Sequence, residues 1–126
     1  MQSAEAPAAH RAWLSGEPAT AACTTRASGL ATAASFEMTQ RILRRRLDDF
    51  LLVSDDQIDD ARRMLARLAH TLAEGAGAAA LAGLLADSQR PEFAAIIVSG
   101  GNADEHEIAT LAAAPSAPPS TTIDAG

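Results

Sequence analysis

The chain has 126 residues, of which 48% are hydrophobic and 3% aromatic, and its formal net charge is -6. This length gives room for one domain. Many of the hydrophobic residues are alanines, which add little apolar area, so we expect a thin core. The negative charge excludes a nucleic-acid-binding surface, because such a surface needs basic residues to neutralise phosphates. All 10 basic residues are arginines, and the chain contains no lysine.

The single cysteine, Cys23, excludes an internal disulfide and fits a reducing compartment. No histidine or carboxylate pattern accompanies it, so we interpret Cys23 as a small, partly buried residue and not as a nucleophile. The histidines His10, His70 and His106 lack the spacing of metal ligands and are predicted to lie at the surface or at helix ends. Because no run of 18 apolar residues and no leader pattern is present, we expect a cytoplasmic protein without membrane contact.

The first half of the chain carries a weak helical signal. Pro7 to Trp13 is compatible with a short helix, in which Trp13 anchors the amino-terminal segment, and Thr24 to Ala31 reads as a short strand or a loop. A helix is predicted from about Ser35, with one face formed by Phe36, Thr39, Leu43 and Leu47. The basic run Arg44 to Arg46 is interpreted as the solvated end of this helix, where it favours the macrodipole.

The clearest local signals come in the middle of the chain. Phe50 to Val53 is a short apolar run typical of a buried parallel strand. Ser54 and Gln57 form a capping-box pattern, with acidic residues between them in the first turn. Apolar residues then recur at helical spacing, at Ile58, Ala61, Met64, Leu65, Leu68 and Leu72. The pattern predicts a helix over residues 55–72.

The last part of the chain predicts a further helix and strand. Glu74-Gly75 breaks the preceding helix, and a helix of small residues follows to Ala86. Ala94 to Val98 is predicted to be a strand that leads into a turn at Ser99-Gly100-Gly101. Residues 112–126 are rich in Ala, Pro, Ser and Thr and are predicted to be a disordered tail. The order of elements indicates an α/β fold, a partial parallel sheet with flanking helices.

Two motifs in this region are candidates for a site. Ser99-Gly100-Gly101-Asn102 follows a predicted strand, and in parallel sheets ligands lie beyond the carboxyl ends of strands. As a bare pattern it is also typical of a tight turn. Glu74-Gly75-Ala76-Gly77-Ala78 is either a helix start with an acid at its amino end or a small-residue face that lets a ligand come close.

Together, these motifs resemble those of the threonine and serine dehydratases, which are pyridoxal-phosphate enzymes of fold type II. The resemblance extends over residues 2–111, roughly a third of a full family member, and implies the C-terminal part of the catalytic domain. It implies that Ser99 offers its hydroxyl to the pyridine nitrogen of the cofactor and that Gly100 and Gly101 shape the pocket. Glu74 would lie beside the cofactor, either as a contact or only as the start of the helix.

The resemblance also implies what these residues lack. In the family, a lysine holds pyridoxal phosphate as a Schiff base, and no lysine is present here. An intact relative removes the β-hydroxyl of L-threonine or L-serine and releases ammonia and a 2-oxo acid. We expect this chain alone to be inactive, to provide no catalytic residue and to bind the cofactor without a covalent bond. Some relatives hold a metal where Gln2 and Ala8 stand, so no metal site is predicted.

A second hypothesis is a non-catalytic interaction module. The chain would be one half of a split enzyme, pairing with a complementing lysine-bearing chain, or it would dock onto an intact homologue. The unpaired edges of its sheet would form the interaction surface.

Overall fold

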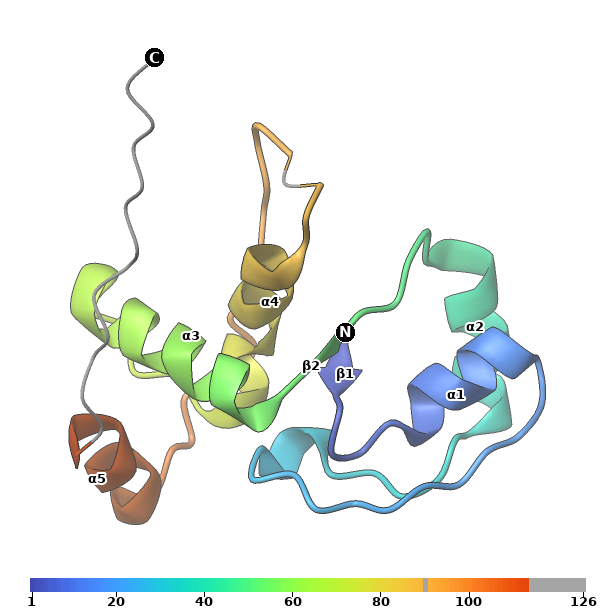
Figure 1. Ribbon diagram of the computed structural model, residues 1–126, viewed down its shortest axis with the longest axis horizontal. Helices are drawn as coiled ribbons and strands as arrows, with labels where there is room; N and C mark the ends of the chain where they lie inside the picture. Colours follow the sequence, from blue (N-terminus) through green and yellow to red (C-terminus); the bar gives the residue numbers. More distant parts are fainter. Residues whose placement is uncertain (90, 114–126) are drawn as a thin grey trace.

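The computed structural model describes residues 1–89 and 91–113, and Figure 1 shows their arrangement. The elements in chain order are β1 (Gln2–Ser3), α1 (Ala8–Ser15), a 3-10 helix (Ser28–Leu30), α2 (Glu37–Arg46), β2 (Leu52–Val53), α3 (Asp55–Leu68), α4 (Gly75–Ala86) and α5 (Glu105–Ala113). The fold is therefore α/β, as predicted. Most of the predicted tail, residues 114–126, lies outside the described residues.

The two strands β1 and β2 form a parallel pair between the helices. Gln2 is in register with Leu52, and Ser3 with Val53. The backbone N–H of Gln2 donates to the Leu51 carbonyl oxygen at 3.0 Å, and that of Ala4 donates to the Val53 carbonyl oxygen at 2.8 Å. The predicted strand at 50–53 is thus present over its last two residues and runs parallel to its neighbour. β1 was not predicted, because two residues carry no periodic signal.

The predicted strand at Ala94–Val98 is wrong for the structure of this chain. Residues 91–104 form no helix or strand, and Phe93 and Ile97 are 86% and 79% exposed. The apolar composition describes a segment suited to burial in a sheet, but a strand also needs a neighbour for its backbone hydrogen bonds. In the described residues the sheet consists of β1 and β2, and neither pairs with this segment.

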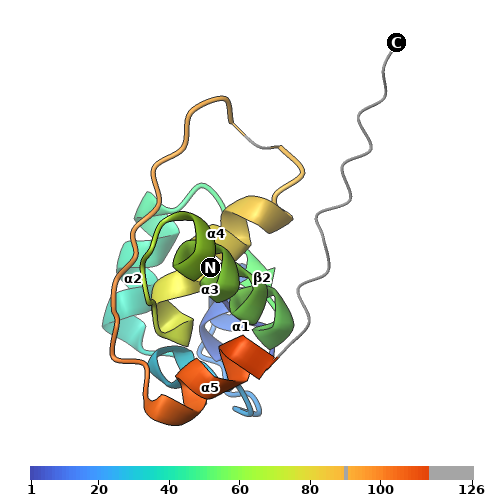
Figure 2. The same cartoon turned by 90° about the vertical axis from the view of Figure 1, so that its left-hand side faces the viewer.

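The core lies where α3 and α4 pack against each other above β2 (Figures 1 and 2). Ile58, Ala61 and Leu65 of α3 meet the small side chains of Ala78 and Ala82 on α4. Alanine and glycine on α4 allow the helices to approach closely, and Val53 fills the space at the end of β2. Ile58 and Val53 are the largest fully buried side chains, together with the small Ser3, so the core is thin, as the composition predicts.

A second packing region joins α1 and α2 (Figure 1). The ring of Phe50 lies edge-to-face with Trp13 and His10, at centroid distances of 6.0 and 5.6 Å. Trp13 therefore anchors the amino-terminal segment, as expected. The side chain of Arg44 donates to the Ala12 carbonyl oxygen at 2.8 Å, so this arginine is not only a solvated helix end but also joins the last turn of α2 to α1.

Helix α3 begins as the sequence predicts but ends earlier. The Ser54 hydroxyl accepts from the Gln57 backbone N–H at 3.2 Å, and the Gln57 side chain accepts from the Ser54 N–H at 2.8 Å, which completes the capping box. The helix ends at Leu68 and not at Leu72. His70 adopts a left-handed conformation with a φ of 52°, which turns the chain out of the helical path.

Three further regions differ from the sequence-based expectations or resolve them. Residues 24–31 are a loop with a 3-10 turn, so the loop alternative is correct. Cys23 is exposed, and the prediction of a partly buried thiol was wrong, because the loop that carries it passes outside the core. Helix α5 was not predicted, although Asp104 and Glu107 form a reciprocal cap at its start, with distances of 2.8 and 3.3 Å. No helix of the described residues is long and apolar enough to cross a membrane.

Candidate functional site

The structure brings the two sequence motifs together at the amino end of α4. Glu74 occupies the N-cap position of α4, and its backbone N–H donates to the Gly100 carbonyl oxygen at 3.2 Å. This bond places the turn that contains Ser99, Gly100 and Gly101 directly beside the start of the helix. Glu74 and Gly100 are half-buried, whereas Ser99 and Gly101 are exposed.

Glycine is required on both sides of this contact because backbone approaches backbone. A Cβ atom at Gly77 would overlap the Gly100 carbonyl oxygen and lie 3.1 Å from the Gly100 nitrogen. A Cβ atom at Gly100 would overlap the Glu74 carboxylate, and one at Gly101 would lie 3.1 Å from the Leu72 carbonyl oxygen. The glycines of the two motifs therefore permit a close approach, and what approaches is the chain's own turn.

The position at a helix terminus determines the electrostatics of the site. The first backbone N–H groups of α4 lack intrahelical partners and give this end of the helix a partial positive charge. The Glu74 carboxylate, at the N-cap, is favourably placed in that field although its side chain makes no capping hydrogen bond. The Ser99 hydroxyl adds a neutral group that both donates and accepts. The cluster can therefore contact a polar ring atom or an anionic group.

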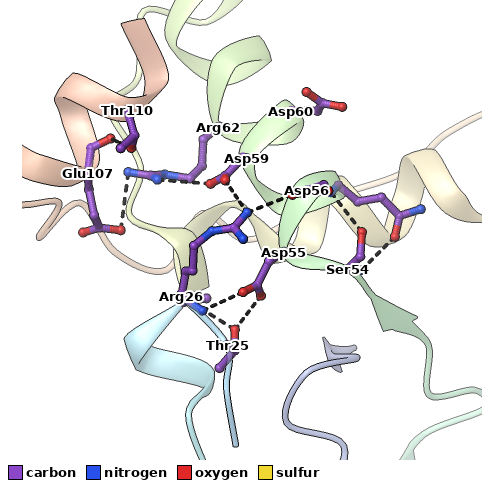
Figure 3. A network of polar contacts seen from close by, with 12 residues as sticks. Thr25, Arg26, Ser54, Asp55, Asp56, Asp59, Asp60, Arg62, Glu107 and Thr110 are labelled. Carbon is purple, nitrogen blue, oxygen red and sulfur yellow. Dashed lines mark hydrogen bonds and ion pairs between the residues drawn. The ribbon is translucent and has the colours of Figure 1, made fainter. Parts of the chain in front are cut away.

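A buried arginine supports the backbone that precedes Glu74 (Figure 3). The Nε of Arg62 donates to the Ala73 carbonyl oxygen at 3.1 Å, and the Arg62 side chain is only 3% exposed. Its guanidinium also lies 3.4 Å from the carboxylates of Asp59 on α3 and Glu107 on α5. Arg62 thus joins three parts of the chain, and one of them is the residue adjacent to Glu74.

Asp55 holds the start of α3 against the loop that precedes the 3-10 turn (Figure 3). Its carboxylate accepts from the Thr25 hydroxyl and the Arg26 backbone N–H, each at 2.6 Å, and from the Ser3 hydroxyl at 3.1 Å. Burial alone would raise the pKa of Asp55, but these hydrogen bonds outweigh it and hold the pKa below its ordinary value. The carboxylate is therefore a structural anion, and the sequence offered no signal for it beyond the capping box.

Exposed ion pairs extend this network. The Arg26 guanidinium lies 2.9 Å from Asp56 and 2.8 Å from Asp59, and these contacts raise its pKa above the ordinary value. In the described ranges, no group of three or more His, Cys, Asp or Glu side chains is placed to hold a metal ion. His70 and His106 are exposed and His10 is half-buried, each on or next to a helix.

Comparison with known proteins identifies the relatives of this chain. Residues 1–100 match the family model described as "Pyridoxal-phosphate dependent enzyme". The chain is 33% identical over 85 residues to the L-threonine ammonia-lyase of Thermotoga maritima, and the match covers 67% of this chain and 21% of that enzyme. The curated relative is therefore much longer than the segment that matches.

Solved structures give the same result. A threonine deaminase from the organism abbreviated T.th. superposes with a TM-score of 0.76 at 34% identity, covering 82% of this chain and 36% of that one. Maize serine racemase has a TM-score of 0.73 at 28% identity, covering 86% and 36%. The serine racemase of Dictyostelium discoideum has a TM-score of 0.72 at 30% identity, covering 81% and 34%. In each case the chain accounts for about a third of the solved protein.

Proposed function

Since the chain belongs to the family of pyridoxal-phosphate-dependent enzymes, we propose that residues 1–111 supply the C-terminal part of a threonine/serine dehydratase-like catalytic domain. In this proposal they form one wall of the cofactor site and do not catalyse the reaction alone. The assembled enzyme would remove the β-hydroxyl of L-threonine or L-serine and release ammonia and a 2-oxo acid. The single cysteine, which is exposed and unpaired, fits work in the cytoplasm.

The observation that carries this proposal is the hydrogen bond between Glu74 and Gly100. It brings Ser99 beside the amino end of α4 although the two motifs are far apart in the sequence. The hydroxyl of Ser99 is exposed and therefore free to meet a ring nitrogen, and a neutral partner does not force that nitrogen to stay protonated. Gly100 and Gly101 keep side chains out of this wall.

The residues present fit the cofactor only in part. A hydroxyl, two glycines and a carboxylate at a helix terminus suit the edge of a pyridoxal ring, and the bound ring would supply the electron sink for elimination. The family's covalent attachment needs a side-chain amine, and the 126 residues contain no lysine. The proposal therefore requires that the lysine come from outside these residues, from another segment or another polypeptide.

The test is to mix the purified 126-residue chain with pyridoxal phosphate. We expect no imine absorbance band, no borohydride-reducible adduct on an internal residue and no release of ammonia from L-threonine or L-serine. The terminal α-amine is the one primary amine of the chain, and burial lowers its pKa more than the nearby Asp49 raises it, so a background adduct there is checked with N-terminally acetylated protein. Turnover of either amino acid, or an adduct mapped to an internal residue, would contradict the proposal.

A second candidate function is that of a non-catalytic interaction module that docks onto an intact homologue. The exposed apolar residues Phe93 and Ile97 favour a role in association. The two candidates differ in the cofactor. The first requires that the turn at Ser99 contact pyridoxal phosphate in the assembled enzyme, whereas the second requires association without such a contact.

A further inference from the structure

From the exposed apolar segment just before the site we infer where the missing part of the enzyme attaches. We propose that residues 93–98, the docking segment, become a β-strand by pairing with the sheet of the lysine-bearing part of a dehydratase-like domain. The proposal rests on the proposed function, because it names the partner that would complete that same site. It commits to this partner and not to a second copy of the chain.

The composition of the docking segment is that of a buried strand, but its surroundings are not. Phe93-Ala94-Ala95-Ile96-Ile97-Val98 contains no charged or polar side chain. Phe93 and Ile97 are 86% and 79% exposed, and no backbone hydrogen bond joins residues 93–98 to the rest of the described chain. Both views show this orange stretch between α4 and α5 running along the outside of the molecule (Figures 1 and 2). Unpaired donors and acceptors on an apolar backbone are a template for strand addition.

One end of the docking segment is already held in place. Gly100 accepts the backbone hydrogen bond from Glu74 and lies against Gly77, so the chain leaves the segment at a defined point beside α4. Pairing would therefore order residues that are attached at their carboxyl end, which lowers the entropic cost of association. It would also place Ser99 at the carboxyl end of a strand, where parallel sheets bind ligands.

The comparisons indicate what covers the segment. The family model extends over residues 1–100, so the family's domain includes the docking segment. The T.th. threonine deaminase is matched over 36% of its length, and the rest of such a domain is the part that this chain does not contain. By family resemblance that part carries the lysine. A partner that provides both a sheet edge and an amine is therefore the occupant that fits.

The experiment co-expresses the tagged chain with the part of the Thermotoga maritima L-threonine ammonia-lyase that precedes its matching segment. Conditions are those in which the relative's own segment, supplied in trans, gives a 1:1 complex. We expect the chain to form the same complex and the amides of residues 94–98 to become protected from hydrogen exchange. Ile97→Asp should weaken the complex at least about tenfold, because a buried isoleucine is replaced by a charge. Leu14→Asp, at a residue 66% exposed on α1, is the matched control and should leave it unchanged.

Three outcomes would overturn the docking proposal. One is the absence of a complex under these conditions, another is a complex in which residues 94–98 stay unprotected, and the third is a dimer of the chain alone in which they are protected. The proposed function fails separately: a complex that protects the segment but shows no difference in cofactor absorbance between wild type and Ser99→Ala would refute the cofactor wall and leave the docking intact. Circular dichroism of the free Ile97→Asp chain confirms that the substitution does not unfold it.

Discussion

The contact between Gly77 and Gly100 can be tested against a second glycine in the same helix. Alanine in place of glycine inside a helix normally stabilises by about 0.5–1 kcal/mol. Gly83 should follow this rule, because its new Cβ would lie 3.0 Å from Cε of Met1, the flexible end of a long side chain. Gly83→Ala is therefore expected to raise the free energy of unfolding by about 0.5–1 kcal/mol.

At Gly77 the same substitution meets backbone that cannot move alone. The new Cβ would overlap the Gly100 oxygen and lie 3.1 and 3.2 Å from the Gly100 nitrogen and carbonyl carbon. Overpacking of this kind costs about 1–3 kcal/mol, which cancels or exceeds the helix gain. We therefore expect Gly77→Ala to be less stable than Gly83→Ala by about 1–3 kcal/mol.

The assay is urea unfolding followed by far-ultraviolet circular dichroism, with hydrogen exchange at the Glu74 amide as a local readout. Faster exchange at Glu74 in Gly77→Ala alone would show that the turn has separated from the helix. If Gly77→Ala is as stable as Gly83→Ala and the Glu74 amide stays equally protected, the close approach of the turn to α4 is not a feature of the molecule, and the candidate site built on it falls.

Two further predictions concern the polar network. Because the pKa of Asp55 is lowered in the folded chain, its stabilisation is complete above the unfolded value of about 4 and is lost as the pH falls through the lower folded value. Asp55→Asn should therefore cost about 2 kcal/mol at neutral pH, and the gap should shrink below about pH 4; a gap that is constant in urea titrations from neutral pH to acid would contradict this. Arg62→Met should cost about 1–3 kcal/mol and speed exchange at the Glu74 amide, because the hydrogen bond to Ala73 is lost. Arg67→Met, at an exposed arginine of the same helix, should change stability by less than about 0.5 kcal/mol; equal effects of the two variants would show that the buried guanidinium does not support the site.

The sequence predicted best where structure depends on neighbouring residues. The capping box at Ser54 and Gln57 specifies the start of α3 through contacts three residues apart, and the helix begins at the predicted residue. The end of the same helix was misplaced by four residues, because the left-handed turn falls on His70 and not on a glycine. The cap of α5 at Asp104 and Glu107 was present in the sequence as the same kind of pattern and was overlooked.

Features that depend on distant residues were predicted less well. The pattern at Ala94–Val98 indicates which residues are suited to a sheet, but it cannot supply the neighbouring strand. The meeting of Glu74 with Gly100 was implied by family resemblance and not by spacing, since it requires the chain to return from the loop after α4. The hydrogen bonds of Asp55 to Thr25 and Ser3 likewise join segments that no local pattern relates.

The shared cation in Arg62 gives the outer helix influence over the interior. One guanidinium contacts Glu107 on α5 and the carbonyl of Ala73, so a displacement of α5 acts on the peptide unit directly before Glu74. Substitutions on the solvent side of the molecule, at positions that never touch a ligand, are thereby connected to the geometry of its most chemically equipped corner.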